Sequence, residues 1–186
     1  VSGCSLGSLS GSGATYTATC TASSDGTPSV SVAASKFNDG VGNDNSVSNP
    51  YTWTYDSTAV TMTISSSAVS SGASTNTAGI ALTFTASEAT SDFASSDITV
   101  SGCSLGSTFA ATSSTVYTAT LTPSANSTSN QSVLLYVYRN QFADAAGNNN
   151  TENAHFSWFY DSIGPTMTIT AEGYNSGNAV ADGATT

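Results

Sequence analysis

The sequence predicts an all-β protein built from β-sandwich domains in tandem, and three observations support this prediction. Apolar residues alternate with threonine and serine, a period of two that is typical of half-buried strands. Residues 51–57 return in similar form at 156–162, so the only two tryptophans, Trp53 and Trp158, lie 105 positions apart. A repeat of about a hundred residues has the size of one β-sandwich domain.

Residues 1–57 are predicted to form a partial domain that contains strands only. Its alternating apolar positions are Tyr16, Ala18, Cys20, Val30, Val32, Tyr51, Trp53 and Tyr55. Clusters rich in Ser, Asp, Asn and Gly at 23–28 and 38–44 separate these strands, as expected for turns. No segment has the apolar spacing of an amphipathic helix.

Residues 58–161 are predicted to form a complete domain. Its apolar strand positions are Met62 and Ile64; Ile80, Leu82 and Phe84; Ile98 and Val100; Tyr117, Ala119 and Leu121; Leu135 and Val137; and Phe156, Trp158 and Tyr160. About seven short strands at this spacing are typical of an immunoglobulin-like sandwich. The many threonines and serines on alternate positions favour antiparallel sheets with one face in water.

Residues 162–186 begin a third copy with the strand of Met167 and Ile169. Residue 1 matches residue 100, so the first copy lacks the equivalents of about 58–99, and neither end supplies most of the equivalents of 82–99. Two explanations are open. The chain is a window of a longer array, or the final strand of one copy completes the first domain of the next, as in strand complementation. In either case the first domain is not expected to fold alone, because it exposes core and an open edge.

Three cysteines are present. Cys4 and Cys103 occupy the same eight-residue motif, at 1–8 and 100–107, whereas Cys20 is matched by Leu121. We therefore expect a Cys4–Cys20 disulfide in the first domain, which implies an oxidising, extracellular setting. Cys103 is left over, either as a small buried residue or bonded to another chain.

The charge of the chain excludes two classes of partner. Two basic residues stand against twelve acidic ones, for a net charge of −10. Nucleic acid and anionic membrane surfaces should both repel such a chain. No apolar run approaches the roughly 20 residues needed to span a bilayer, so membrane insertion is not expected.

Several motifs resemble the bacterial-type Ig-like repeats of large extracellular adhesins and of algal or protist surface or fibre proteins. The most specific is Tyr-Asp-Ser-x-x-x-Thr-Met-Thr-Ile, at 55–64 and again at 160–169, and three further segments, 87–93, 97–102 and 142–148, fit the same family. The resemblance covers essentially the whole chain and implies an extracellular stalk, spacer or fibre subunit. Val60 departs from the family, which usually has a linker proline there, as at Pro165.

The second domain differs from the first at positions predicted to face outward. Leu134, Tyr136 and Tyr138 stand where the first domain has Ser29, Ser31 and Ala33, and Phe159 replaces Thr54. Four large apolar side chains on one outer face exceed what a monomer normally exposes. We expect this face to contact another domain or subunit, and cover by a loop or a glycan is the alternative.

Two kinds of surface site are predicted in the loops. Asp39, Asp56, Asp144 and Asp161 lie near the predicted domain ends, with Glu88 in a connection, and oxygen-rich loops of related repeats bind calcium. Ordinary turn formation by Asp and Asn beside Gly is the alternative. Asn126, Asn130 and Asn149 each begin an Asn-x-Ser/Thr triplet and would accept glycans in a secreted eukaryotic protein. No other cofactor is expected.

Catalysis is poorly supported by the residues present. His155, the only histidine, is expected in an asparagine-rich turn beside the aromatic strand, with a surface or packing role rather than an acid–base one. A carboxylate pair such as Asp92 and Asp97 lacks aromatic residues that would frame a sugar cleft. We therefore predict a structural subunit of an extracellular fibre, whose partners are copies of itself. An adhesin stalk or spacer is the first alternative, and a carbohydrate-binding surface module that uses the outer aromatic residues is the second.

Overall fold

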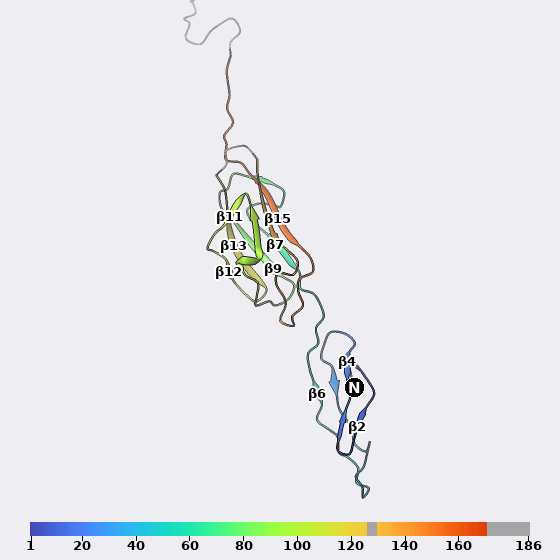
Figure 1. The fold of residues 1–186 in the computed structure, drawn as a ribbon. Helices are drawn as coiled ribbons and strands as arrows, with labels where there is room; N and C mark the ends of the chain where they lie inside the picture. The colour runs from blue at the N-terminus through green and yellow to red at the C-terminus, as the bar shows by residue number, and fades with distance from the viewer. Residues whose placement is uncertain (126–129, 171–186) are drawn as a thin grey trace, which may run out of the picture.

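The computed structural model describes residues 1–125 and 130–170. Two β-rich bodies lie end to end, with the first repeat at one end, the second repeat in the middle, and residues 162–170 leading away from the far end of the second repeat (Figure 1). The chain therefore has a direction, with the first repeat at its head and the extended segment at its tail. Among the described residues, no helix combines the length and the apolar character of a membrane span.

The first sheet of the second repeat has the strand order β11-β13-β9-β7, with the short β12 also paired to β13. Its strands are β7 (Met62–Ser65), β9 (Ile80–Ala86), β11 (Cys103–Leu105), β12 (Ala110–Ala111) and β13 (Val116–Pro123). All of these pairs are antiparallel, and β9 lies in the centre, between β7 and β13. The alternation of buried and more exposed residues along β9 is the period-two pattern that the sequence predicts for its strand.

The second sheet has the strand order β10-β14-β15-β8. Its strands are β8 (Ser74–Thr75), β10 (Ile98–Ser101), β14 (Gln131–Val137) and β15 (Ala154–Tyr160). Three of these strands were expected from apolar alternation. The fourth, β8, was not, because it has two polar residues only; it pairs with β15 in parallel. The sheet is therefore mixed rather than purely antiparallel.

The core of the second repeat lies between the inner faces of these two sheets. Its buried apolar residues are Val60, Val69, Ile80, Leu82, Phe84, Ala86, Phe93, Ile98, Tyr117, Ala119, Leu121, Val133, Leu135, Val137, Phe142, Phe156 and Trp158. Phe93, which precedes the short 3-10 helix η1 (Ser95–Asp97), packs against four other rings within 5.0–5.7 Å. Contacts of this kind contribute beyond the area that they bury.

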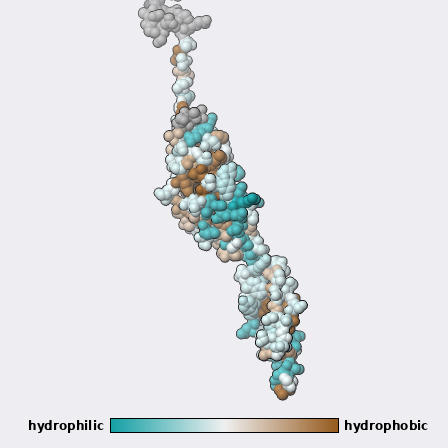
Figure 2. Space-filling model, viewed as in Figure 1, coloured by the Kyte–Doolittle hydropathy of each residue, from teal (hydrophilic) through white to brown (hydrophobic). Residues whose placement is uncertain are grey.

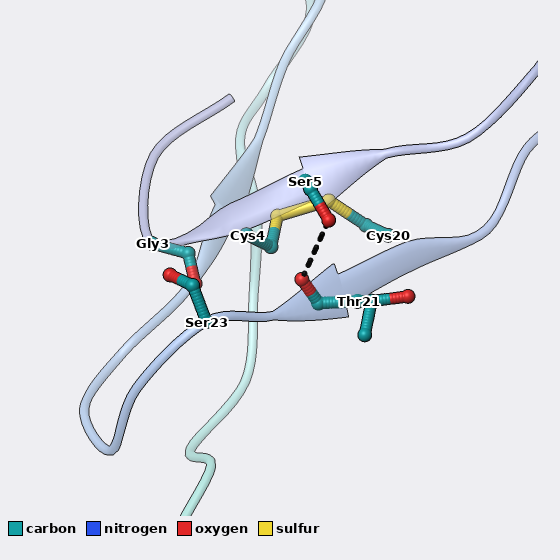
Figure 3. Close-up of a disulfide and its surroundings, with 6 residues drawn as sticks. All are labelled: Gly3, Cys4, Ser5, Cys20, Thr21 and Ser23. Atoms are coloured by element: carbon teal, nitrogen blue, oxygen red, sulfur yellow. Dashed lines mark hydrogen bonds between the residues drawn. A yellow bond between two sulfur atoms is a disulfide. The ribbon is translucent and has the colours of Figure 1, made fainter.

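The first repeat has only short strands. They are β1 (Cys4–Leu6), β2 (Ser10–Ser12), β3 (Thr15–Thr17), β4 (Cys20–Ala22), β5 (Ser29–Val30) and β6 (Tyr51–Thr52), and they form three separate two-stranded sheets. The Cys4–Cys20 disulfide links β1 to β4, with the two Cα atoms 5.7 Å apart, and a hydrogen bond from Ser5 to Thr21 lies beside it (Figure 3). Closing a loop of this size stabilises a fold by about 3 kcal/mol.

No strand of the described first repeat corresponds to β7, β9 or β10. In the second repeat, β9 pairs with β13 from Val116 to Leu121 and completes that sheet, so its absence leaves the equivalent sheet edge of the first repeat open. Val32, whose equivalent in the second repeat is the buried Val137, is exposed and lies outside β5. A strand can bury its inner face only when a second layer covers it.

Candidate functional site

An apolar cleft of about 610 Å3 opens on the first repeat. Its lining residues are Leu6, Ala18, Cys20, Val30, Tyr51 and Trp53. Ala18 and Cys20 are the equivalents of Ala119 and Leu121, which in the second repeat lie beside Leu82 and Ile80 of β9. The cleft is therefore the inner face of a sandwich that lacks its central strand. Figure 2 shows brown apolar atoms among the pale surface of this repeat.

The tail segment has the opposite property, because in the part of the chain that the structure describes it carries apolar side chains that remain exposed. Met167 and Ile169 are each 87% exposed, and Ile163 is exposed as well. Their equivalents in the second repeat, Met62 and Ile64, belong to β7 and pack on the core. One chain thus presents an unfilled apolar cleft at its head and an unpartnered strand sequence at its tail.

The outer face of the β10-β14-β15-β8 sheet carries the apolar residues singled out from the sequence. Leu134 and Tyr136 are partly buried, while Tyr138 is 43% and Phe159 40% exposed. The rings of Tyr136 and Tyr138 are parallel, with centroids 5.4 Å apart, and His155 stacks on Tyr136 from β15. We call Leu134, Tyr136, Tyr138, His155 and Phe159 the aromatic ridge.

His155 was expected in an asparagine-rich turn, and that placement is wrong. It lies within β15, opposite Tyr136 in the register with β14. Ring stacking at a solvent-facing strand position explains the residue without any catalytic role. The Asp92 and Asp97 carboxylates are likewise engaged in structure: Asp92 accepts hydrogen bonds from the Ala143 amide, and Asp97 from the Ala94 amide.

A cluster of three carboxylates lies at the junction of the repeats. One carboxylate oxygen from each of Asp56, Glu88 and Asp144 lies within 4.8 Å of the others. Of the four aspartates proposed as metal ligands, the structure brings Asp56 and Asp144 together; Asp39 and Asp161 belong to no such group within the described chain. Glu88 completes the cluster, and the sequence had marked it only as an acidic residue in a connection.

The electrostatics of this junction cluster differ from residue to residue. Burial, together with the nearby carboxylates of Asp56 and Asp144, raises the pKa of Glu88 above its ordinary value of 4.5. Burial also pushes the pKa of Asp144 upward, but hydrogen bonds from the Asn148 side chain and from the amides of residues 146–148 outweigh it and hold that pKa below 3.8. A hard divalent cation would relieve the repulsion, and carboxylate oxygens are the ligands that calcium prefers.

The remaining predicted sites are on loops or at the core edge. Asn130 and Asn149 are exposed, as an accepting asparagine must be, and Asn126 lies outside the described residues. Cys103 is a free thiol packed at the edge of the core, and burial raises its pKa to about 11. Such a thiol reacts slowly near neutral pH, because the thiolate is the reactive form.

Comparison with known proteins gives one match. The model of a family described as a bacterial Ig-like domain matches residues 56–158. This range contains the strands of the second repeat and the Asp56, Glu88 and Asp144 cluster. Searches of curated proteins and of solved structures found no significant match to the chain.

Proposed function

This chain belongs to the bacterial Ig-like domain family, and from that premise we propose that it is the structural subunit of an extracellular fibre whose copies join head to tail. Domains of this family are non-catalytic, serve structural or spacer roles, and are typically extracellular or at the cell surface. Assembly into a fibre is a more specific proposal than a structural or spacer role, and the two ends of the chain support it.

The observation that carries the proposal is the complementarity of those ends. The head offers the apolar cleft lined by Leu6, Val30 and Trp53, and the tail offers Met167 and Ile169 on one side of an extended segment. The tail of one copy enters the cleft of the next and takes the place that β9 has in the second repeat, so that its backbone adds to the open edge beside β4. Strand addition supplies main-chain hydrogen bonds, and pockets for alternate side chains supply specificity.

Burial of the apolar tail side chains contributes to the free energy of assembly. Burying a side chain of the size of Met or Ile stabilises by about 1.5–3 kcal/mol. Met167 and Ile169 both start almost fully exposed, so most of that gain remains available on binding. The cleft residues that they cover lose contact with water in the same step.

The test compares two tail variants of the full chain by sedimentation velocity and electron microscopy. Met167→Asp with Ile169→Asp places two charges on the apolar side of the tail, whereas Thr166→Asp with Thr168→Asp places the same charge on the opposite side. We expect the native chain and the threonine variant to form filaments, and the Met/Ile variant to remain as single particles.

A native chain that sediments as a monomer at every concentration would reject the fibre. The adhesin stalk or spacer would then be the better account, because a spacer has no need to bind copies of itself. Filaments that persist in the Met/Ile variant would keep the fibre and remove the tail as the joining strand.

A further inference from the structure

We infer that the junction between the two repeats of one chain is the template for the contact between two copies: the linker at Asp161 of one copy docks on the turn at residues 39–43 of the next. This inference rests on the proposed head-to-tail assembly and adds the residues that set its geometry. The contact is polar, and it is separate from the insertion of the tail strand into the cleft.

The template is a contact within the chain between the linker and a turn of the second repeat. The side-chain amide of Asn148 donates one hydrogen bond to the Asp56 main-chain oxygen (3.2 Å) and another to the Asp144 carboxylate (3.0 Å). The same carboxylate accepts hydrogen bonds from the amides of Ala146 and Gly147. The contact leaves Asp144 buried and Asn148 partly buried.

The first repeat has the same turn already formed. The Asp39 carboxylate accepts hydrogen bonds from the amides of Val41 (3.0 Å) and Asn43 (2.9 Å), and the Asn43 side chain donates to Asp39 (2.9 Å). Gly42 has φ 95°, against 96° for its equivalent Gly147. A glycine adopts such angles without strain.

The difference between the two turns is what covers them. Asp39 and Asn43 are exposed, whereas their equivalents Asp144 and Asn148 lie under the linker. The Asn43 side-chain amide has two N–H donors, and within the described chain it uses one of them for its hydrogen bond to Asp39. The second N–H of Asn43 is the equivalent of the Asn148 N–H that donates to the Asp56 main-chain oxygen.

The second half of the contact is also already formed, at the other end of the chain. The Asp56 carboxylate accepts a hydrogen bond from the Thr58 amide at 3.0 Å, and the Asp161 carboxylate accepts one from the Ile163 amide at 3.0 Å. Both linkers leave their repeats with the same local turn. The main-chain oxygen of Asp161 is thus the equivalent of the docked oxygen of Asp56.

The turn at 39–43 lies at the end of the first repeat that faces away from the second repeat, and Asp161 lies at the end of the second repeat that faces away from the first. Only a second copy can therefore bring this turn and this linker together. In the first repeat, hydrogen bonds run along one long hairpin from Gly26 and Tyr55, beside the linker, to Asp39 and Asn43 at its tip. In the second repeat, β14 and β15 begin the same hairpin with Gln131 opposite Tyr160, and the turn at 144–148 is its tip. Head-to-tail stacking places each tip against the preceding linker.

The experiment mixes two variants that each have one free thiol, Val41→Cys and Ser162→Cys, both made in a Cys103→Ala chain that keeps the Cys4–Cys20 disulfide, and treats them with a short thiol-reactive cross-linker. A bond between these positions can form only between two copies. Thr122→Cys mixed with Ser162→Cys measures random collision, and Ala146→Cys with Ser57→Cys in one chain measures the template contact. We expect the first pair to cross-link roughly tenfold or more faster than the collision control, because docking raises the effective concentration of the two thiols.

Filaments that form without this cross-link would overturn the junction contact and leave the proposed fibre in place. Chains that remain monomeric would overturn both proposals. Cross-linking in filaments whose tail carries Met167→Asp and Ile169→Asp would support the junction and show that it acts independently of strand insertion.

Discussion

The Tyr117 hydroxyl donates a hydrogen bond of 2.7 Å to the main-chain oxygen of Thr90 and thereby fixes the connection that follows β9. Tyr117 is 4% exposed, whereas its equivalent in the first repeat, Tyr16, is 56% exposed. The two tyrosines occupy one sequence position in two environments, because only the second repeat has β9.

We predict that Tyr117→Phe lowers the free energy of unfolding of the second repeat by about 1–2 kcal/mol, because the Thr90 oxygen loses its partner in a buried place. Tyr16→Phe is the matched control and should change little, since its ring already faces water. Chemical denaturation followed by tryptophan fluorescence measures both, because Trp53 lies in the first repeat and Trp158 in the second. Equal losses of stability in the two variants would contradict a stabilising role for the Tyr117–Thr90 hydrogen bond.

A second disulfide should form in the second repeat when Leu121 is replaced by cysteine. Cys4 and Cys20 occupy diagonal positions of the β1–β4 pair, and Cys103 and Leu121 occupy the same positions of the β11–β13 pair. Oxidised Leu121→Cys should melt higher than its reduced form, on the order of 10 °C, because the bond restricts the unfolded chain. Ala119→Cys is the control; a bond forming there instead would show that the register is wrong.

Neutralising Glu88 should stabilise the junction at neutral pH. The pKa of Glu88 is raised by burial and by the Asp56 and Asp144 carboxylates, so folding becomes less favourable as pH rises above 4.5 and through the raised folded-state value. Glu88→Gln removes this penalty. The variant should therefore melt above the native chain at pH 7, and the difference should shrink toward pH 4, as followed by calorimetry. A constant difference across this range would contradict the electrostatic cause.

Calcium should act on the same carboxylates. We predict that millimolar calcium raises the melting temperature of the native chain, because a bound cation stabilises the folded state by mass action. Glu88→Gln should weaken the response, whereas Asp39→Asn should leave it unchanged, since Asp39 lies outside the cluster. Isothermal titration checks the binding directly. If Asp39→Asn abolished the calcium-induced rise in melting temperature, the calcium site would lie in the first repeat instead.

Lateral association should depend on the aromatic ridge. Tyr138→Ser with Phe159→Ser removes two exposed rings of the ridge, and we expect thinner filaments with an unchanged axial repeat in electron micrographs. Thermal unfolding should move little, because neither side chain is buried. Unchanged filament width would assign the ridge to something other than contact between filaments, and a glycan-binding measurement would then follow.

The fold of the second repeat could be predicted from sequence because its signals are local. Alternation in β9 and β13, and the recurrence of the Trp53 segment at Trp158, directly report strands that have one buried face. β8 lacks this signal, because its two polar residues are held by pairing with β15 rather than by burial. Val32 shows the converse: its alternation predicts an inner face, yet within the described residues its side chain is exposed.

The candidate site could be predicted only in part, because it depends on distances between segments far apart in the chain. Glu88 lies in a connection beyond β9 and meets Asp56 and Asp144 only after both sheets have packed. Asp39 and Asp144 look alike in sequence and form the same turn, but only one of them has a linker against it. This difference between Asp39 and Asp144 arises from tertiary contacts, so the local sequence pattern does not predict it.

The parallel pairing of β8 with β15 has a mechanical consequence. The Phe159 amide donates to the Ala73 oxygen (2.9 Å) and the Asp161 amide to the Thr75 oxygen (3.0 Å), so the last strand before the tail is fastened directly to an early segment of its own repeat. Tension between the head and the tail runs along these strands and across their hydrogen bonds. These hydrogen bonds are loaded in shear and must break together. The β8–β15 pair, next to the tail, is therefore where the second repeat resists mechanical unfolding.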